Sequence, residues 1–244
     1  MLRFIVFILF LFLPCTLFLG GKSSDNIPDS AERTAASDVE AYASLYRSMQ
    51  LEGVVNWKAF RQAVAGYYKI DNRKREVLTL IDFSRPSTAK RLFVFDMRER
   101  KVLFSSVVSH GKNSGDNYAT SFSNEYGSYK SSLGFYLTES TYQGKNGYSL
   151  ILNGLEKGIN DRARERAIVM HGAAYADPSV ASRGGRLGRS FGCPAVPQKL
   201  SRPIIDAIKG GSVMYIYAET PDYLAHSSCL LYTSPSPRDR SLSR

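Results

Sequence analysis

The chain has 244 residues, of which 43% are hydrophobic and 12% aromatic, enough to bury the core of one sizeable domain. Its 32 basic and 22 acidic residues give a formal net charge of +10, with no block of like charges. No repeat or low-complexity segment occurs between residues 30 and 225, which excludes a repeat architecture for this part of the chain.

The N-terminus has the pattern of a secretory signal. Arg3 precedes an apolar run from Phe4 to Leu19, and small residues follow. The run is shorter than the roughly 20 residues of a spanning helix, and Pro14 interrupts it. We expect residues 1–21 to be a signal peptide, with an uncleaved signal anchor that holds the protein to the membrane as the alternative.

In either case the remainder is predicted to be exported, to the periplasm or the cell envelope. An exported protein with distributed positive charge suits an anionic partner such as a carboxylate-rich cell-wall polymer. Nucleic acid is not expected as a partner, because export separates the protein from most of it.

The next segments are predicted to be helical. Residues 22–36 are polar and form an expected linker. Ser37, with a glutamate three residues later, matches a capping box and predicts a helix through about residue 50. A second helix is expected over 57–69, where apolar residues recur at three- and four-residue steps. Together they make a helical preface, 37–72.

From residue 73 to 226 the pattern becomes that of a mainly β domain. Strands are expected at 76–84, 91–97, 101–110, 134–142, 148–155, 166–172 and 212–218. A short helix is expected to start at Ser201 and Pro203 and to end at Gly210. Short strands separated by loops rich in glycine and serine predict a β sandwich or barrel with a few small helices.

The C-terminal stretch 229–244 has no helical or strand period. From Cys229 to Asp239 it resembles a translated sequencing adapter, so we interpret 229–244 as a processing artefact. A natural disordered tail is the alternative.

Setting aside the signal, which holds Cys15, and the tail leaves one cysteine, Cys193. Structural cysteines of exported proteins come in pairs, so a lone one indicates a reactive thiol, although a buried inert thiol stays open. One cysteine and three scattered histidines show no metal-ligand spacing, and we predict neither a metal site nor a cofactor.

The residues around Cys193 suit a nucleophile. Gly192 permits a close approach of substrate to the backbone, and Pro194 biases Cys193 toward an extended conformation. The N–H groups of Cys193 and Gly192 are candidate oxyanion donors. His110 and His171 each end a predicted strand and precede a glycine, which is typical of a presented base.

Two reaction classes do not fit. The stretch after Cys193, "PAVPQK", has no arginine to hold a phosphate, which argues against a phosphatase. In papain-type peptidases the cysteine comes before the histidine, whereas here His171 comes first.

The chain between about residues 92 and 217 resembles the L,D-transpeptidase catalytic (YkuD-like) family, and most closely its murein L,D-transpeptidase branch. The resemblance is carried by "RLFVFDMRERKVLFSSVVSHGKNSG", "ATSFSN", "SSLGFYLT", "LNGLEKGIND", "RERAIVMHGA" and "GRLGRSFGCPAVP". It implies the family's fold and a thiol acyltransferase that acts on peptidoglycan stem peptides.

On this resemblance, Cys193 would attack a meso-diaminopimelate carbonyl, release D-alanine and form a thioester. An amine of a neighbouring stem would then give a 3–3 cross-link, whereas water would give carboxypeptidase activity. His171 would take the thiol proton, oriented by the Gly172 carbonyl. Carbapenems typically acylate such cysteines. A catalytically idle wall-binding module is a further alternative.

Two positions depart from the commoner family pattern. Phe191 stands where that pattern has histidine, and Ala195 where it has arginine. We therefore expect Arg186 and Arg189, in the loop before Cys193, to bind substrate carboxylates. Ser190 and His110 complete the predicted substrate-binding residues, with Cys193, His171, Gly172 and Gly192 as the predicted catalytic ones.

Overall fold

A computed structural model describes residues 30–231, with side chains described from residue 37 onward. The expected signal at 1–21 and residues 232–244 of the tail lie outside the described residues. Between residues 30 and 231, no helix is long and apolar enough to cross a bilayer.

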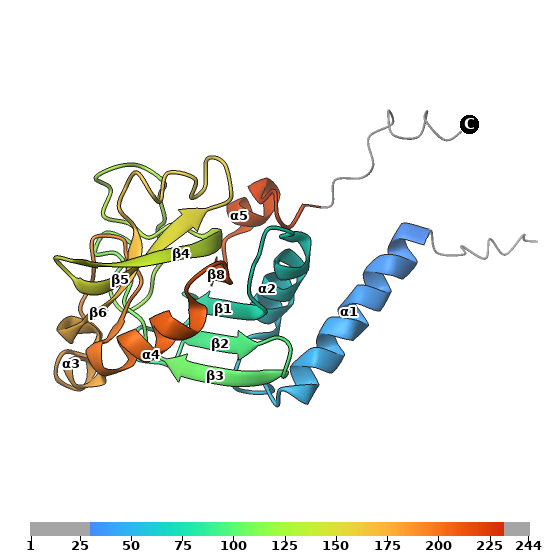
Figure 1. The fold of residues 1–244 in the computed structure, drawn as a ribbon, viewed down its shortest axis with the longest axis horizontal. Coiled ribbons are helices and arrows are strands. Elements are labelled where there is room, and N and C mark those ends of the chain that lie inside the picture. Colours follow the sequence, from blue (N-terminus) through green and yellow to red (C-terminus); the bar gives the residue numbers. More distant parts are fainter. Residues whose placement is uncertain (1–29, 232–244) are drawn as a thin grey trace, which may run out of the picture.

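The fold is built on one mixed sheet of eight strands in the order β3-β2-β1-β8-β4-β5-β6-β7 (Figure 1). The strands are β1 (Val77–Asp82), β2 (Leu92–Asp96), β3 (Lys101–Ser106), β4 (Gly134–Gly144), β5 (Gly147–Gly154), β6 (Val169–Ala173), β7 (Ala195–Pro197) and β8 (Val213–Tyr217). The pairs β1/β8 and β6/β7 are parallel, and the other neighbours are antiparallel.

The two edges of the sheet meet behind the predicted site. Ser109, just after β3, pairs with Ala195 of β7. Their backbones exchange two hydrogen bonds, with N–O distances of 2.7 and 3.4 Å. Because β3 and β7 are the edge strands, this bridge curls the sheet into a nearly closed barrel. The predicted mainly β fold with a few small helices is confirmed.

In the described part of the chain, five α-helices and one 3₁₀ turn lie around the sheet. They are α1 (Ser30–Ser48), α2 (Trp57–Lys69), α3 (Pro178–Gly184), α4 (Gln198–Ile208), α5 (Pro221–His226) and the turn Ala174–Ala176. Helix α2 packs against β1 and β8, and α1 lies outside α2 (Figure 1). Helix α4 packs against β6, the strand that carries His171.

Helix α2 shares its core with the sheet. The Asn56 side chain caps it by accepting hydrogen bonds from the backbone N–H groups of Lys58 and Ala59. On its buried face, the Phe60 ring lies edge-on to Phe95 of β2, with centroids 5.5 Å apart. The proposed domain boundary at residue 72 stays a prediction, but the two sides of it are packed together.

Three expected starts are wrong. Helix α1 begins at Ser30, inside the expected linker, so Ser37 does not cap it. Strand β6 begins at Val169, because Ala167 has a left-handed φ of 53° that interrupts the extended backbone. Helix α4 begins at Gln198, and the Ser201 hydroxyl bonds back to the Gln198 carbonyl instead of capping.

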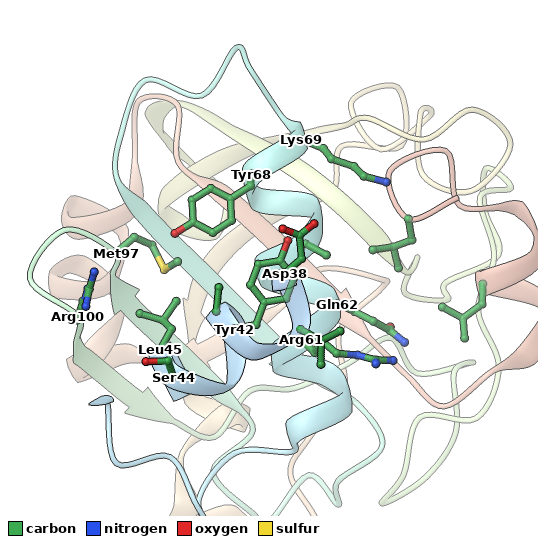
Figure 2. Close-up of a pocket in the computed structure, with 15 residues that line it drawn as sticks. Asp38, Tyr42, Ser44, Leu45, Arg61, Gln62, Tyr68, Lys69, Met97 and Arg100 are labelled. Atoms are coloured by element: carbon green, nitrogen blue, oxygen red, sulfur yellow. The ribbon is translucent and has the colours of Figure 1, made fainter. Parts of the chain in front are cut away.

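A pocket of about 1000 Å³ lies between α1 and α2 (Figure 2). Met97 and Arg100, from the turn between β2 and β3, and Leu224 and Leu230, from the C-terminal part, complete its lining. None of its lining residues belongs to the predicted site.

The described C-terminal residues are tied to the sheet through a buried carboxylate. Glu156 is fully buried and accepts hydrogen bonds from Tyr223 and Ser227. Beyond them, Cys229 and Leu230 pack partly buried against the core. The artefactual origin of 229–244 stays a prediction.

Candidate active site

The parallel pairing of β6 with β7 brings the predicted nucleophile and base together. His171 of β6 is in register with Ala195 of β7, two residues after Cys193. The Cys193 Sγ accepts a hydrogen bond from the Val169 N–H at 3.5 Å and donates to the Ala167 carbonyl at 3.7 Å. Val169 and His171 are two residues apart, so their side chains share one face of β6. The Cys193 thiol therefore contacts the backbone of β6, the strand that carries the His171 imidazole.

Hydroxyl groups fix the backbone around Cys193. The Ser190 Oγ donates to the Cys193 carbonyl at 2.6 Å and accepts from the Gly192 N–H at 3.0 Å. The Ser131 Oγ donates to the Gly192 carbonyl at 3.1 Å and accepts from the Gly111 N–H at 3.0 Å. Ser190 is buried and holds this turn, so its hydroxyl has a structural use that the sequence did not indicate.

Gly192 is required by the protein's own packing. Its φ is +124°, and a Cβ there would lie 2.8 Å from the Lys130 carbonyl oxygen and 2.9 Å from Ile168 Cδ1. These atoms occupy the space that we expected a substrate to use. Since the Gly192 N–H donates to Ser190, it is not free for an oxyanion. Within the described part of the chain, the Cys193 N–H makes no hydrogen bond to another residue, and it faces its own thiol.

His171 has a defined tautomer. Its Nδ1 lies 3.0 Å from the Gly172 carbonyl oxygen, which can only accept, so Nδ1 carries the proton and Nε2 has the free lone pair. A Cβ on Gly172 would lie 2.6 Å from Ser201 Oγ, which explains the close fit of β6 against α4. This contact with the Gly172 carbonyl is the one that the family resemblance implied, and the role of His171 as the base stays a prediction.

Burial sets the resting protonation states of the pair. It raises the pKa of the Cys193 thiol, while the Val169 N–H and the charge of Arg166 act in the opposite direction. Burial also lowers the pKa of His171, against the contact with the Gly172 carbonyl. At neutral pH the pair is therefore a thiol and a neutral imidazole, which is suited to general-base activation.

His110 does not lie where a substrate could reach it, which corrects its predicted role. Its side chain is fully buried, and its Nδ1 lies 2.8 Å from Arg91 Nη2. Arg91 is itself fully buried, with its guanidinium 4.8 Å from the Phe83 ring centroid. The His110 carbonyl accepts a hydrogen bond from the Ser190 N–H at 2.9 Å, so the residue supports the Cys193 loop from behind.

Arg186 and Arg189 lie in the loop before Cys193 and are already paired. Arg186 Nε lies 2.6 Å from Asp116 Oδ1, and Arg189 Nη1 lies 3.4 Å from the same oxygen. Arg189 Nη1 also donates to the Gly115 carbonyl at 2.9 Å. Because Asp116 is 76% exposed, it is a partner that a substrate carboxylate could replace.

A further group beside Cys193 was missed. Phe191 is 66% exposed, and its ring centroid lies 4.9 Å from that of Tyr129. Lys112 Nζ lies 4.3 Å from the Tyr129 centroid and 4.7 Å from the Phe191 centroid. No sequence spacing links these three residues, because the pairing of Lys112 N–H with the Ser190 carbonyl brings them together. Arg166, which interacts electrostatically with Cys193, was expected only as the first residue of a strand.

Among the described residues, no group of three or more histidine, cysteine, aspartate or glutamate side chains is placed to hold a metal ion.

The family model of the L,D-transpeptidase catalytic domain matches residues 51–217, more than half of the chain. The chain belongs to this family. The resemblance inferred from the sequence is thereby confirmed. No curated protein has a significant sequence match to this chain.

Solved structures of low sequence identity are also similar to this L,D-transpeptidase. An L,D-transpeptidase from Mycobacterium smegmatis is 16% identical over 59% of each chain, with a TM-score of 0.37. One from Stackebrandtia nassauensis is 16% identical over 75% of this chain and 79% of its own, with a TM-score of 0.36. A mutant of the helical cell shape determining protein Pgp2 from Campylobacter jejuni is 13% identical, over 64% of this chain and 54% of its own, with a TM-score of 0.40. The match thus spans about three-fifths of the M. smegmatis chain.

Proposed function

We propose that this L,D-transpeptidase is an exported cysteine acyltransferase that forms 3–3 cross-links between peptidoglycan stem peptides through a thioester on Cys193. The observation that supports it most is the pairing of β6 with β7, which sets the Cys193 thiol beside the strand of His171. Membership of the family supports peptidoglycan as the substrate.

In the first half-reaction, His171 Nε2 takes the proton of the Cys193 thiol as Sγ attacks the carbonyl of a meso-diaminopimelate residue. The C–S bond forms, and the C–N bond to the terminal D-alanine breaks. His171 returns the proton to the departing amine of D-alanine. The Gly172 carbonyl, bonded to Nδ1–H, stabilises the imidazolium that exists between these transfers.

The oxyanion of this step needs a donor close to the nucleophile. The Gly192 N–H is engaged with Ser190, and Pro194 has no N–H. We therefore assign the Cys193 N–H, which bonds to no other described residue and faces the thiol, as the oxyanion donor.

In the second half-reaction, the side-chain amine of a neighbouring stem attacks the thioester. The new C–N bond forms, the C–S bond breaks, and His171 carries the amine proton to Sγ. Water in place of the amine gives a free carboxylate and hence L,D-carboxypeptidase activity.

Stem peptides carry carboxylates, and the rim of the site offers cations for them. We propose that a substrate carboxylate replaces Asp116 on Arg189 and Arg186. Losing a charge-assisted hydrogen bond costs roughly 1.5–3 kcal/mol, or about 10- to 150-fold in kcat/KM. Arg189→Ala should show this loss on tetrapeptide substrate while its reaction with a small neutral thiol reagent stays unchanged. Equal kcat/KM for Arg189→Ala, Arg186→Ala and wild type would show that neither arginine binds a substrate carboxylate.

The decisive experiment incubates the purified protein with a disaccharide-tetrapeptide and analyses the products by mass spectrometry. The wild type should give cross-linked dimer and free D-alanine, and a carbapenem should add its mass to Cys193. Cys193→Ala should give neither product nor adduct. Cys229→Ala is the matched control, because Cys229 is the other free cysteine of the described chain, and it should retain both.

Each other outcome contradicts the proposal in a defined way. Hydrolysed monomer without dimer would make the protein a carboxypeptidase. No product and no adduct from the folded wild type would leave a catalytically idle wall-binding module. An adduct that survives in Cys193→Ala would remove Cys193 as the nucleophile.

A further inference from the structure

Arg166, in the turn before β6, is bonded to one segment of the chain through both of its terminal nitrogens. Nη1 donates to the Ser123 carbonyl at 2.7 Å and to Ser132 Oγ at 2.6 Å. Nη2 donates to the Lys130 carbonyl at 2.7 Å and to Ser128 Oγ at 3.2 Å. All four acceptors lie within residues 123–132, and all four are uncharged.

The same guanidinium lies against the backbone of the Cys193 loop. Nη2 is 3.5 Å from the position that a Cβ would take on Gly192, the residue before Cys193. The next residue along the chain, Ala167, accepts a hydrogen bond from the Cys193 thiol through its backbone carbonyl. Arg166 therefore lies next to the residue before Cys193 in space, and next to the hydrogen-bond acceptor of the thiol along the chain.

The charge of Arg166 has no carboxylate partner. Its neighbours Arg162 and Arg164 pair with Glu125 and Glu139 at 2.9 and 2.7 Å. No carboxylate among the described residues comes within 4.0 Å of Arg166, although its side chain is partly buried. A partly buried cation without a counter-ion is costly, and a nearby anion recovers part of that cost. The anion that the proposed reaction creates beside it is the Cys193 thiolate.

A direct role for Arg166 in holding a substrate carboxylate does not fit the contacts. Bidentate pairing needs two N–H groups on one side of the guanidinium. The four N–H groups of Nη1 and Nη2 are already donated to residues 123–132, which leaves only Nε.

We propose that Arg166 is a positioning residue that fastens residues 123–132 against the Cys193 loop and stabilises the Cys193 thiolate with its positive charge. The proposal rests on the proposed function only in taking Cys193 as the nucleophile. The other ionisable groups nearby are His171, which is neutral at rest, and Tyr175, whose pKa is raised to about 12 by burial and by Cys193. Arg166 is thus the charged side chain that acts on the thiol.

The test measures the thiol directly and uses no peptidoglycan, so it can fail independently of the proposed function. Iodoacetamide alkylation of Cys193 is followed from pH 6 to pH 11 by peptide mass spectrometry, which separates Cys193 from Cys229. Arg166→Gln keeps two N–H donors but loses the charge, whereas Arg166→Lys keeps the charge but loses the planar fork. Arg164→Gln, which breaks the pair between the exposed Arg164 and the partly buried Glu139, is the matched control.

Arg166→Gln should slow alkylation at neutral pH by about tenfold, because one adjacent opposite charge has an effect of this order on a titrating group, and its midpoint should move to higher pH. Arg166→Lys should keep the wild-type midpoint, and Arg164→Gln should match the wild type throughout. Both Arg166 variants should lower the melting temperature followed by circular dichroism, because each loses hydrogen bonds to residues 123–132.

An unchanged midpoint in Arg166→Gln overturns the electrostatic role. Equal shifts in Arg166→Gln and Arg166→Lys overturn it as well, because they would show that lost positioning, and not lost charge, alters the thiol. If Arg166→Gln does not fold, Arg166→Met and Arg166→Lys are compared on the same two criteria.

Discussion

Two histidine-glycine pairs lie close to strand β7, one within β6 and one just after the bridge at Ser109, and their imidazoles have different surroundings. His171 of β6 has its Nδ1 on the carbonyl of the next residue and its Nε2 lone pair free, beside the strand neighbour that carries Cys193. His110 has its Nδ1 on Arg91 and its ring fully enclosed. The same dipeptide therefore serves once as a candidate base and once as an internal support, and the contacts of Nδ1 decide which.

The glycines of the two pairs differ in a parallel way. Gly111 lies against backbone atoms of two other segments, residues 129–131 and Gly192, whose Cα is 3.0 Å from the position of the missing Cβ. Gly172 lies mainly against the side chain of Ser201 in α4. Variants of the His171–Gly172 pair can therefore test catalysis, and variants of the His110–Gly111 pair can test structural support.

The largest expected effect is on the rate of thioester formation, which should depend on the His171 imidazole and not on that of His110. His171→Ala should slow thioester formation by about 10²- to 10⁴-fold, the usual cost of removing a general base. His110→Asn should leave it nearly unchanged, because an amide oxygen can accept from Arg91 in place of Nδ1. Single-turnover acylation by a carbapenem, followed by intact mass, measures both. Equal slowing in the two variants would contradict the assignment of one base.

The next largest effect is on the pH dependence of the unfolding free energy, to which His110 should contribute more than His171. Burial, followed by the charge of Arg91, lowers the pKa of His110 to about 4, so the unfolded chain binds a proton between pH 6.5 and 4 that the folded chain does not. This contribution is complete above pH 6.5 and is lost as the pH falls toward 4, up to about 3 kcal/mol of unfolding free energy. Urea titrations at pH 7, 5.5 and 4 measure it.

His110→Asn should remove most of that pH dependence, whereas His171→Asn should retain most of it. A slope that persists unchanged in His110→Asn would show that other groups cause the acid sensitivity. It would also mean that the two histidines differ less than their burial suggests.

The smallest effect concerns the glycines. Gly111→Ala places a Cβ 2.5 Å from the Tyr129 carbonyl oxygen and should cost about 1–3 kcal/mol, the usual cost of overpacking. Gly172→Ala should cost less, because its Cβ would meet the Ser201 side chain, with Oγ at 2.6 Å and Cβ at 2.8 Å, and not two backbone atoms at such distances. Ser201→Gly should recover part of the loss. Urea unfolding of the three variants gives the order. A larger loss for Gly172→Ala would contradict the description of Gly111 as the more tightly enclosed position.

Much of the fold could be predicted from the sequence because its strands are short, largely apolar runs separated by loops. Seven of the eight strands overlap the expected segments, and α2 has the expected bounds. Strand β7 was missed because three residues, Ala195–Pro197, are too short to show alternation. Helix α3 was missed because none of its side chains is buried, so it has no apolar face to detect.

The candidate site was predictable where its chemistry is local. The lone Cys193 can be seen in the sequence itself, and the contact between His171 and its neighbour Gly172 was expected from the family resemblance. The substrate contact expected of His110 was wrong because its burial depends on Arg91 and Phe83, which no local spacing links to it. Arg166 was missed for a similar reason, since its partners at 123–132 lie about forty residues earlier.

The parallel pairing of β1 with β8 has a consequence for how the chain folds. Leu78 pairs with Val213, so the centre of the sheet joins residues from opposite ends of the domain. Such a contact pays a large loop-closure entropy before it contributes any stability, and folding rates fall as contacts become less local. We expect refolding from denaturant to be slow for a protein of this size. Weakening the contact, for example with Met214→Ala in β8, should accelerate unfolding if β1 and β8 pair late in folding.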